Sequence, residues 1–76
     1  MDMPVINTEA TGANIKTIMD NAGKTVKDIQ MACRLSTGNA VYKWIHGICM
    51  PTIDNIVIIA DVCGVTINDI VVIEKI

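Results

Sequence analysis

Apolar residues recur at helical spacing along most of this chain, and polar or glycine-containing breaks divide them into five runs. A spacing of i, i+3, i+4 and i+7 is typical of a helix that buries one face. The pattern predicts helices over residues 11–22, 25 to 33 or 34, 37 or 38 to 46, 53–63 and 67–72. Residues 1–9 show little periodicity and include a proline, so we expect a flexible N-terminal arm before a helical domain over residues 10–76.

The ends of these runs carry residues that cap helices. Glycine is common where a helix closes in a left-handed conformation, and it follows three of the runs, at Gly23, Gly47 and Gly64. A threonine three residues before an acidic residue is typical of a capping box at a helix start. The chain has this spacing twice, at Thr25–Asp28 and at Thr66–Asp69.

The second and third runs meet at a short polar corner, residues 34–38. Two short amphipathic helices joined by such a corner form a helix-turn-helix, whose second helix can enter a DNA groove. In the third run the inward positions are Ala40, Val41, Trp44 and Ile45, and the outward positions are Asn39, Tyr42, Lys43 and His46.

The fourth run is apolar nearly all round, so a helix there needs a second covering partner. Its expected core stripe consists of Ile53, Ile56, Val57 and Ala60. Ile58 and Val62 lie on the opposite side, and the chain ends in a short apolar tail, residues 70–76. Three readings stay open. In the first, the tail folds back and covers Ile58 and Val62 within one chain. In the second, two copies form a homodimer through Ile58, Val62 and Ile73. In the third, the tail pairs as an extended strand, which its β-branched residues suit.

Charge is distributed unevenly along the chain, although the formal net charge is only −2. Residues 16–46 carry five cations against two carboxylates, a balance of +3, whereas residues 1–15 carry −2 and residues 47–76 carry −3. Positive charge therefore gathers in or just before the helix-turn-helix. Such polarity would orient the domain toward a polyanion.

Length and residue types exclude several other classes. A chain of 76 residues makes one small domain, and its 51% hydrophobic content suits a core at this size. Three cysteines cannot all pair within one chain, so we expect reduced thiols and a cytoplasmic location. We expect no secretory leader and no membrane span. Neither a phosphate loop nor a catalytic or metal-binding cluster is evident, so we expect no enzyme, cofactor, metal or small-molecule ligand.

With these residues in place, the chain resembles the Cro and phage-repressor type of helix-turn-helix domain, also called the Xre type. The resemblance covers roughly residues 12–72, and its most specific stretches are residues 44–51 and 64–66. It implies an all-α, five-helix lambda-repressor-like domain that binds double-stranded DNA, often as a dimeric transcriptional repressor. The chain departs from the family in a corner that is one residue longer and has Arg34 in place of the usual glycine. A left-handed backbone at that arginine would cost about 1–2 kcal/mol.

The resemblance also implies which residues contact DNA. The base contacts, carried over by position, are Thr37, Gly38, Asn39, Tyr42 and Lys43. Asn39 can pair bidentately with adenine, and Lys43 can reach guanine or a phosphate. Phosphate contacts are expected around the amides at the start of the second helix and at the end of the third, from Thr25, Lys27, Lys24 and His46.

A protein-interaction module on the same fold, with weak or no DNA binding, is the second hypothesis. The acidic overall balance, the sparse basic face and the apolar second side of the fourth helix favour it. Retardation of DNA by the protein distinguishes the two hypotheses.

Overall fold

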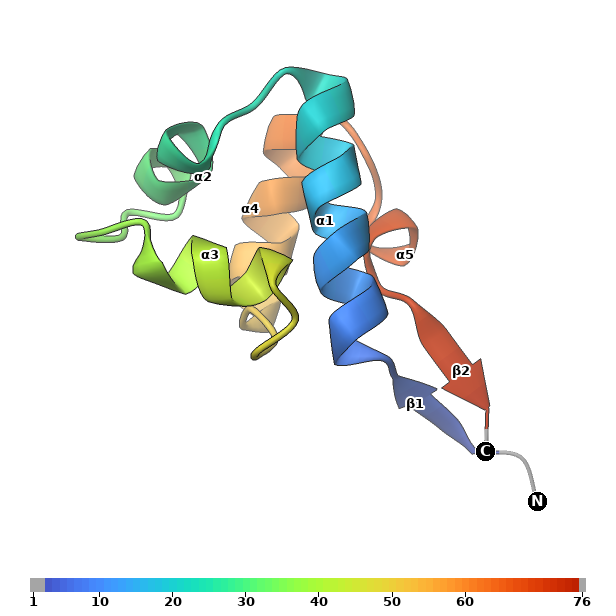
Figure 1. Cartoon of the computed structure of the whole chain (residues 1–76). Coiled ribbons are helices and arrows are strands. Elements are labelled where there is room, and N and C mark those ends of the chain that lie inside the picture. The colour runs from blue at the N-terminus through green and yellow to red at the C-terminus, as the bar shows by residue number, and fades with distance from the viewer. Residues whose placement is uncertain (1–2, 76) are drawn as a thin grey trace.

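Five helices and two short strands make up residues 3–75, the part of the chain that the computed structural model describes (Figure 1). The helices are α1 (Thr8–Ala22), α2 (Val26–Ala32), α3 (Asn39–Ile45), α4 (Ile53–Cys63) and α5 (Ile67–Ile70). The strands are β1 (Pro4–Ile6) and β2 (Ile73–Lys75). The predicted, mostly helical architecture is confirmed, with the small sheet as an addition.

Side-chain caps decide where the helices begin. Asn7 accepts a hydrogen bond from the Ala10 amide at 2.9 Å, so α1 begins at Thr8, earlier than the apolar pattern predicts. Both predicted capping boxes are present, Thr25–Asp28 at α2 and Thr66–Asp69 at α5. The helix starts that carry threonine caps are therefore confirmed, whereas the start of α1 was predicted wrongly because its cap lies outside the apolar run.

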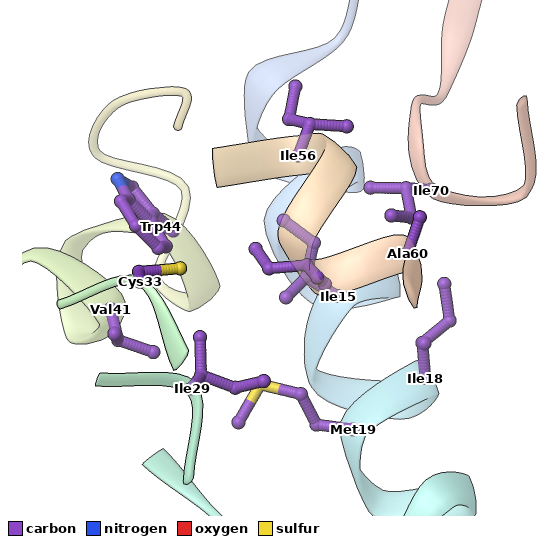
Figure 2. Packing of buried hydrophobic residues seen from close by; sticks show 11 residues of the cluster. Ile15, Ile18, Met19, Ile29, Cys33, Val41, Trp44, Ile56, Ala60 and Ile70 are labelled. Atoms are coloured by element: carbon purple, nitrogen blue, oxygen red, sulfur yellow. The ribbon is translucent and has the colours of Figure 1, made fainter. Parts of the chain in front are cut away.

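The core draws side chains from all five helices, and Figure 2 shows them converging on one cluster. Its most deeply buried large side chains are Ile15, Met19, Ile29, Val41, Ile59 and Ile70. Trp44 is 5% exposed, which confirms its predicted inward position. This shared core fixes α2 and α3 against α1 and α4.

The predicted core face of α4 is wrong in part. Ile56 and Ala60 are buried as expected, but Ile53 is 63% exposed and Val57 is 49% exposed. Ile59, which the predicted stripe left out, is fully buried. The reason is that α4 contacts α1, α2 and α5 together, so its buried sector is turned toward Ile59.

This rotation also changes the homodimer prediction. Ile58 and Val62 are half-buried and pack against the core, so they do not form a free surface. Ile73 is 59% exposed. For residues 73–75 of the tail, the structure has the extended strand, which pairs with β1.

The two strands bring the ends of the chain together. β1 runs antiparallel to β2, with Pro4 opposite Lys75 and Ile6 opposite Ile73. A strand and the first two residues of α1 therefore lie within residues 3–9, where the sequence indicated a flexible arm. Residues 1–2 of that arm and residue 76 of the tail lie outside the described residues.

Polar side chains of α1 hold the segment that leads into β2. The backbone amide of Asn7 donates to the Val72 carbonyl oxygen, and the side-chain oxygen Thr11 Oγ1 accepts from the backbone amide of Val72, both at 2.9 Å. Asn14 Nδ2 donates to the carbonyl oxygens of residues 69 and 70 at 2.6 and 2.9 Å. Thr11 is fully buried, so water cannot reach the Val72 amide from the side that faces Thr11. The Thr11 hydroxyl is the acceptor that satisfies this amide.

Candidate nucleic-acid interface

α2 and α3 lie on the same side of α1 and are joined by a corner at residues 33–38 (Figure 1). The Arg34 amide donates to the Met31 carbonyl oxygen at 3.1 Å, and the Leu35 amide donates to the Gln30 carbonyl oxygen at 2.9 Å. This pair of bonds is a Schellman closure of α2. Arg34 has φ 57°, so the corner has the left-handed turn expected of glycine, formed here by an arginine.

The outer face of α3 is open along its whole length. Asn39, Tyr42, Lys43 and His46 are all exposed, as is Thr37 in the corner. The rings of Tyr42 and His46, one helical turn apart, have centroids 6.1 Å apart. The predicted outward positions of this helix are therefore confirmed, and their side chains share one surface.

Gly38 has a packing role between the two helices. It is half-buried, and a Cβ there would lie 3.1 Å from Val26 Cγ1 and 3.6 Å from Tyr42 Cε2. Thr37 Oγ1 accepts a hydrogen bond at 3.3 Å from the amide of Asn39, the first residue of α3, although the N-cap of that helix is Gly38. Gly38 can therefore offer DNA only its backbone, and one lone pair of the Thr37 hydroxyl is already engaged.

Gln30 was absent from the predicted site, although it shapes this corner. Its Nε2 donates to the Leu35 carbonyl oxygen at 3.4 Å, and its Oε1 lies 3.6 Å from the position of a Cβ on Gly38. Val26 and Gln30 both face Gly38, as residues four apart on a helix can. The four-residue spacing of Val26 and Gln30 is the feature of the sequence from which the role of Gln30 in this corner could have been predicted.

The N-terminus of α2 differs from the open anion site that was expected. Thr25 Oγ1 accepts from the Asp28 amide at 3.2 Å, and the Asp28 carboxylate accepts from the Thr25 amide at 2.8 Å. The hydrogen bond from the Thr25 amide, followed by a smaller contribution from the Thr25 side chain, holds the pKa of the Asp28 carboxyl below its ordinary value. A negative charge thus already lies at this helix end. The cations predicted for this helix end are Lys27, which is exposed, and Lys24, which is half-buried.

Among the described residues, the cations in the helix-turn-helix and just before it form no salt bridges, whereas Lys16 on α1 forms one. Lys16 Nζ, on α1, lies 2.6 Å from Asp20 Oδ1. Within residues 3–75, no salt bridge joins Lys24, Lys27, Arg34 or Lys43 to a carboxylate. Residues 44–74 contain no lysine or arginine, so the side of the molecule formed by α4 and α5 is acidic.

The described residues contain no other group that suggests a ligand. Cys33, Cys49 and Cys63 are free thiols, and burial raises the pKa of Cys33 and Cys63. Within residues 3–75, no three His, Cys, Asp or Glu side chains come together as metal ligands would. No helix in that range is both long enough and apolar enough to cross a membrane.

Comparison with known proteins adds no family. No protein-family model matches the chain, and no curated protein sequence or solved structure matches it either.

Proposed function

We propose that this protein is a sequence-specific double-stranded DNA-binding protein, a small repressor-like transcriptional regulator that places α3 in the major groove. The proposal includes a lambda-repressor-like fold, action in the cytoplasm and no catalysis. The observation that carries it is the outer face of α3, which is polar and exposed from end to end. Its residue types are those that read bases, and Lys43 on this face has no salt-bridge partner within residues 3–75.

Base recognition rests mainly on two side chains of that face. Asn39 lies in the first turn of α3, the part of a recognition helix that meets base edges in this type of docking. Its amide suits adenine, and the ammonium group of Lys43, one turn later, suits guanine or a phosphate. Tyr42 and His46 flank them and suit a thymine methyl group and a phosphate, respectively.

Phosphate binding must come from few groups. Lys24 and Lys27 near α2, with Lys43 and His46 on α3, give about four contacts per subunit, each contributing roughly −0.9 to the log–log salt slope. One subunit would therefore bind weakly, and we include a homodimer on a two-fold symmetric site in the proposal. Ile73 is the predicted interface residue that is exposed. Sedimentation of the wild type and of Ile73→Asp tests this part, and a wild type that stays monomeric at all concentrations refutes it.

The test of DNA binding begins with selection of bound duplexes from a random pool, followed by mobility shifts across salt concentrations. We expect Asn39→Ala to weaken binding to the selected duplex roughly tenfold. Lys43→Ala should weaken it and lower the salt slope. Asn21→Ala, on the exposed end of α1, and Lys75→Ala, on β2, are the matched controls. Failure of micromolar protein to retard any DNA at low salt would contradict the proposal.

The protein-interaction module is the second candidate function, and one observation favours it. Ile53 and Val57 form an exposed apolar pair on α4, and Asp54 and Asp61 lie on the same helix without a salt-bridge partner in residues 3–75. If the mobility shifts show no DNA binding, this surface becomes the leading candidate. Retardation that depends on Asn39 excludes it as the main function.

A further inference from the structure

Four helix ends within residues 3–75 close in the same way. In each, one amide donates to the carbonyl oxygen three residues back, and the next amide donates to the carbonyl oxygen five residues back, at 2.9–3.3 Å. The residue at the turn is left-handed each time. These residues are Gly23 (φ 70°), Arg34 (φ 57°), Gly47 (φ 72°) and Gly64 (φ 71°). Three of the four closures use glycine, and the exception is in the corner of the helix-turn-helix.

Space does not explain the exception. A Cβ at Gly23 or Gly64 would meet no atom within 4 Å, so glycine is used there for its backbone conformation and not for its size. The same conformation strains any residue with a Cβ, because that atom comes too close to the following carbonyl oxygen. Arg34 therefore carries a cost that the chain avoids at the other three closures.

No polar contact of the Arg34 side chain with the described residues offsets that cost. Arg34 is exposed, and within residues 3–75 its side chain makes no hydrogen bond and no salt bridge. A strained residue whose side chain has no partner in the fold is a candidate for a role outside the fold. The guanidinium group is a planar fork of donors that matches the oxygens of a phosphate.

We propose that Arg34 is a DNA-backbone contact, whose guanidinium group binds a phosphate beside the groove that α3 occupies. The inference rests on the proposed function and adds a residue to it. Arg34 precedes Thr37 by three residues, so their Cα atoms lie at most about 11 Å apart. Lys27 in α2, Arg34 in the corner and Lys43 in α3 are all exposed, so Arg34 adds an exposed cation between the two helices in sequence.

Arg34→Gly tests the inference because stability and DNA binding should change in opposite directions. Removing the strain should raise the melting temperature by a few degrees, since about 1 kcal/mol corresponds to roughly 4–8 °C for a domain of this size. Losing the phosphate contact should reduce the salt slope by roughly 0.9 per subunit and weaken binding to the selected duplex several-fold. Arg34→Lys keeps the charge and should keep most of the slope.

Two further variants serve as controls. Gly64→Arg places an arginine in an open left-handed closure of α4 and should lower the melting temperature, which measures the cost directly. Lys75→Ala removes a cation from β2, away from the corner, and should leave the salt slope unchanged (Figure 1).

An unchanged slope in Arg34→Gly, with Asn39→Ala still impaired, overturns the inference and leaves the proposed function standing. A lower melting temperature in Arg34→Gly also overturns it, because Arg34 would then stabilise the fold. Absence of DNA binding by the wild type overturns both.

Discussion

Gly12 of α1 and Gly47, the residue that closes α3, lie directly against each other. A Cβ on Gly12 would meet the carbonyl oxygen of Trp44 and would lie 2.9 Å from the Gly47 nitrogen. A Cβ on Gly47 would lie 2.7 Å from the Cα of Glu9. The two backbones approach closely because neither residue has a side chain. This contact sets how α3 is held against α1.

Gly12→Ala should therefore destabilise the protein, although alanine is the better helix former. Propensity alone would favour alanine by about 0.5–1 kcal/mol, whereas overpacking a buried contact costs about 1–3 kcal/mol. Thermal unfolding measures the balance. Asn21→Ala, at an exposed position of α1, is the control and should be neutral or stabilising. A higher melting temperature for Gly12→Ala would show that the two helices are not so tightly apposed.

Thr11→Val should loosen the C-terminal segment from α1. Valine keeps the shape of threonine but leaves the half-buried Val72 amide without its acceptor, a loss at the lower end of the range of about 1–3 kcal/mol for an unsatisfied donor. Hydrogen exchange should become faster at the amide of residue 72, and the melting temperature should fall. Thr17→Val, at an exposed position of the same helix, is the control. Unchanged exchange at residue 72 would contradict the role of Thr11.

Local signals in the sequence predicted much of this fold. Threonine–aspartate pairs marked the starts of α2 and α5, and glycines marked three helix ends. The phase of α4 was not predictable, because apolar residues at 53, 56–60 and 62 leave almost every face compatible with burial. Its true phase depends on α2 and α5, which contact it from elsewhere in the chain. The sheet likewise pairs residues 4–6 with residues 73–75, a contact between the two ends that no local pattern contains.

The candidate site was predicted in the same uneven way. The outward positions of α3 follow from helical periodicity, and the structure exposes all four. The spacing of Thr25 and Asp28 already predicts a capping box, and in that box the two residues bind each other's amides. Those amides are then not open to a phosphate, although the start of α2 was expected to bind one. Gly38 looked like a base contact by position, but its place against Val26 and Gln30 depends on how α2 and α3 cross.

The two capping boxes should make stability depend on pH in the acid range. Hydrogen bonds from the Thr25 and Thr66 amides hold the pKa values of Asp28 and Asp69 below the ordinary value of 3.8. A carboxyl whose pKa is lower in the folded state stabilises that state fully above the unfolded pKa. This stability is lost as the pH falls through the folded pKa.

Melting temperatures measured from pH 6 down to pH 2 test this dependence. The double variant Asp28→Asn with Asp69→Asn should be less stable than the wild type near neutral pH and should lose less stability on acidification. Asp61→Asn, whose carboxylate accepts no hydrogen bond within residues 3–75, is the matched control and should keep the wild-type profile. Parallel curves for the wild type and the double variant would contradict the role of the boxes.

The face of α4 that is buried against the core includes Ile58 but not its neighbour Val57. Substitution by aspartate should therefore affect stability differently at these two residues. Ile58→Asp puts a carboxylate at a half-buried position against the core, which should cost about 2–4 kcal/mol and lower the melting temperature by several degrees or more. Val57→Asp changes a side chain that is 49% exposed and should stay within about 0.5 kcal/mol of the wild type. Thermal unfolding of the two variants, with sedimentation to record their oligomeric state, separates burial within one chain from burial between two. At protein concentrations where the wild type is monomeric, Val57→Asp should have little effect. A loss of stability as large as that of Ile58→Asp, seen only at concentrations where the wild type self-associates, would show that the exposed side of α4 is an interface in solution.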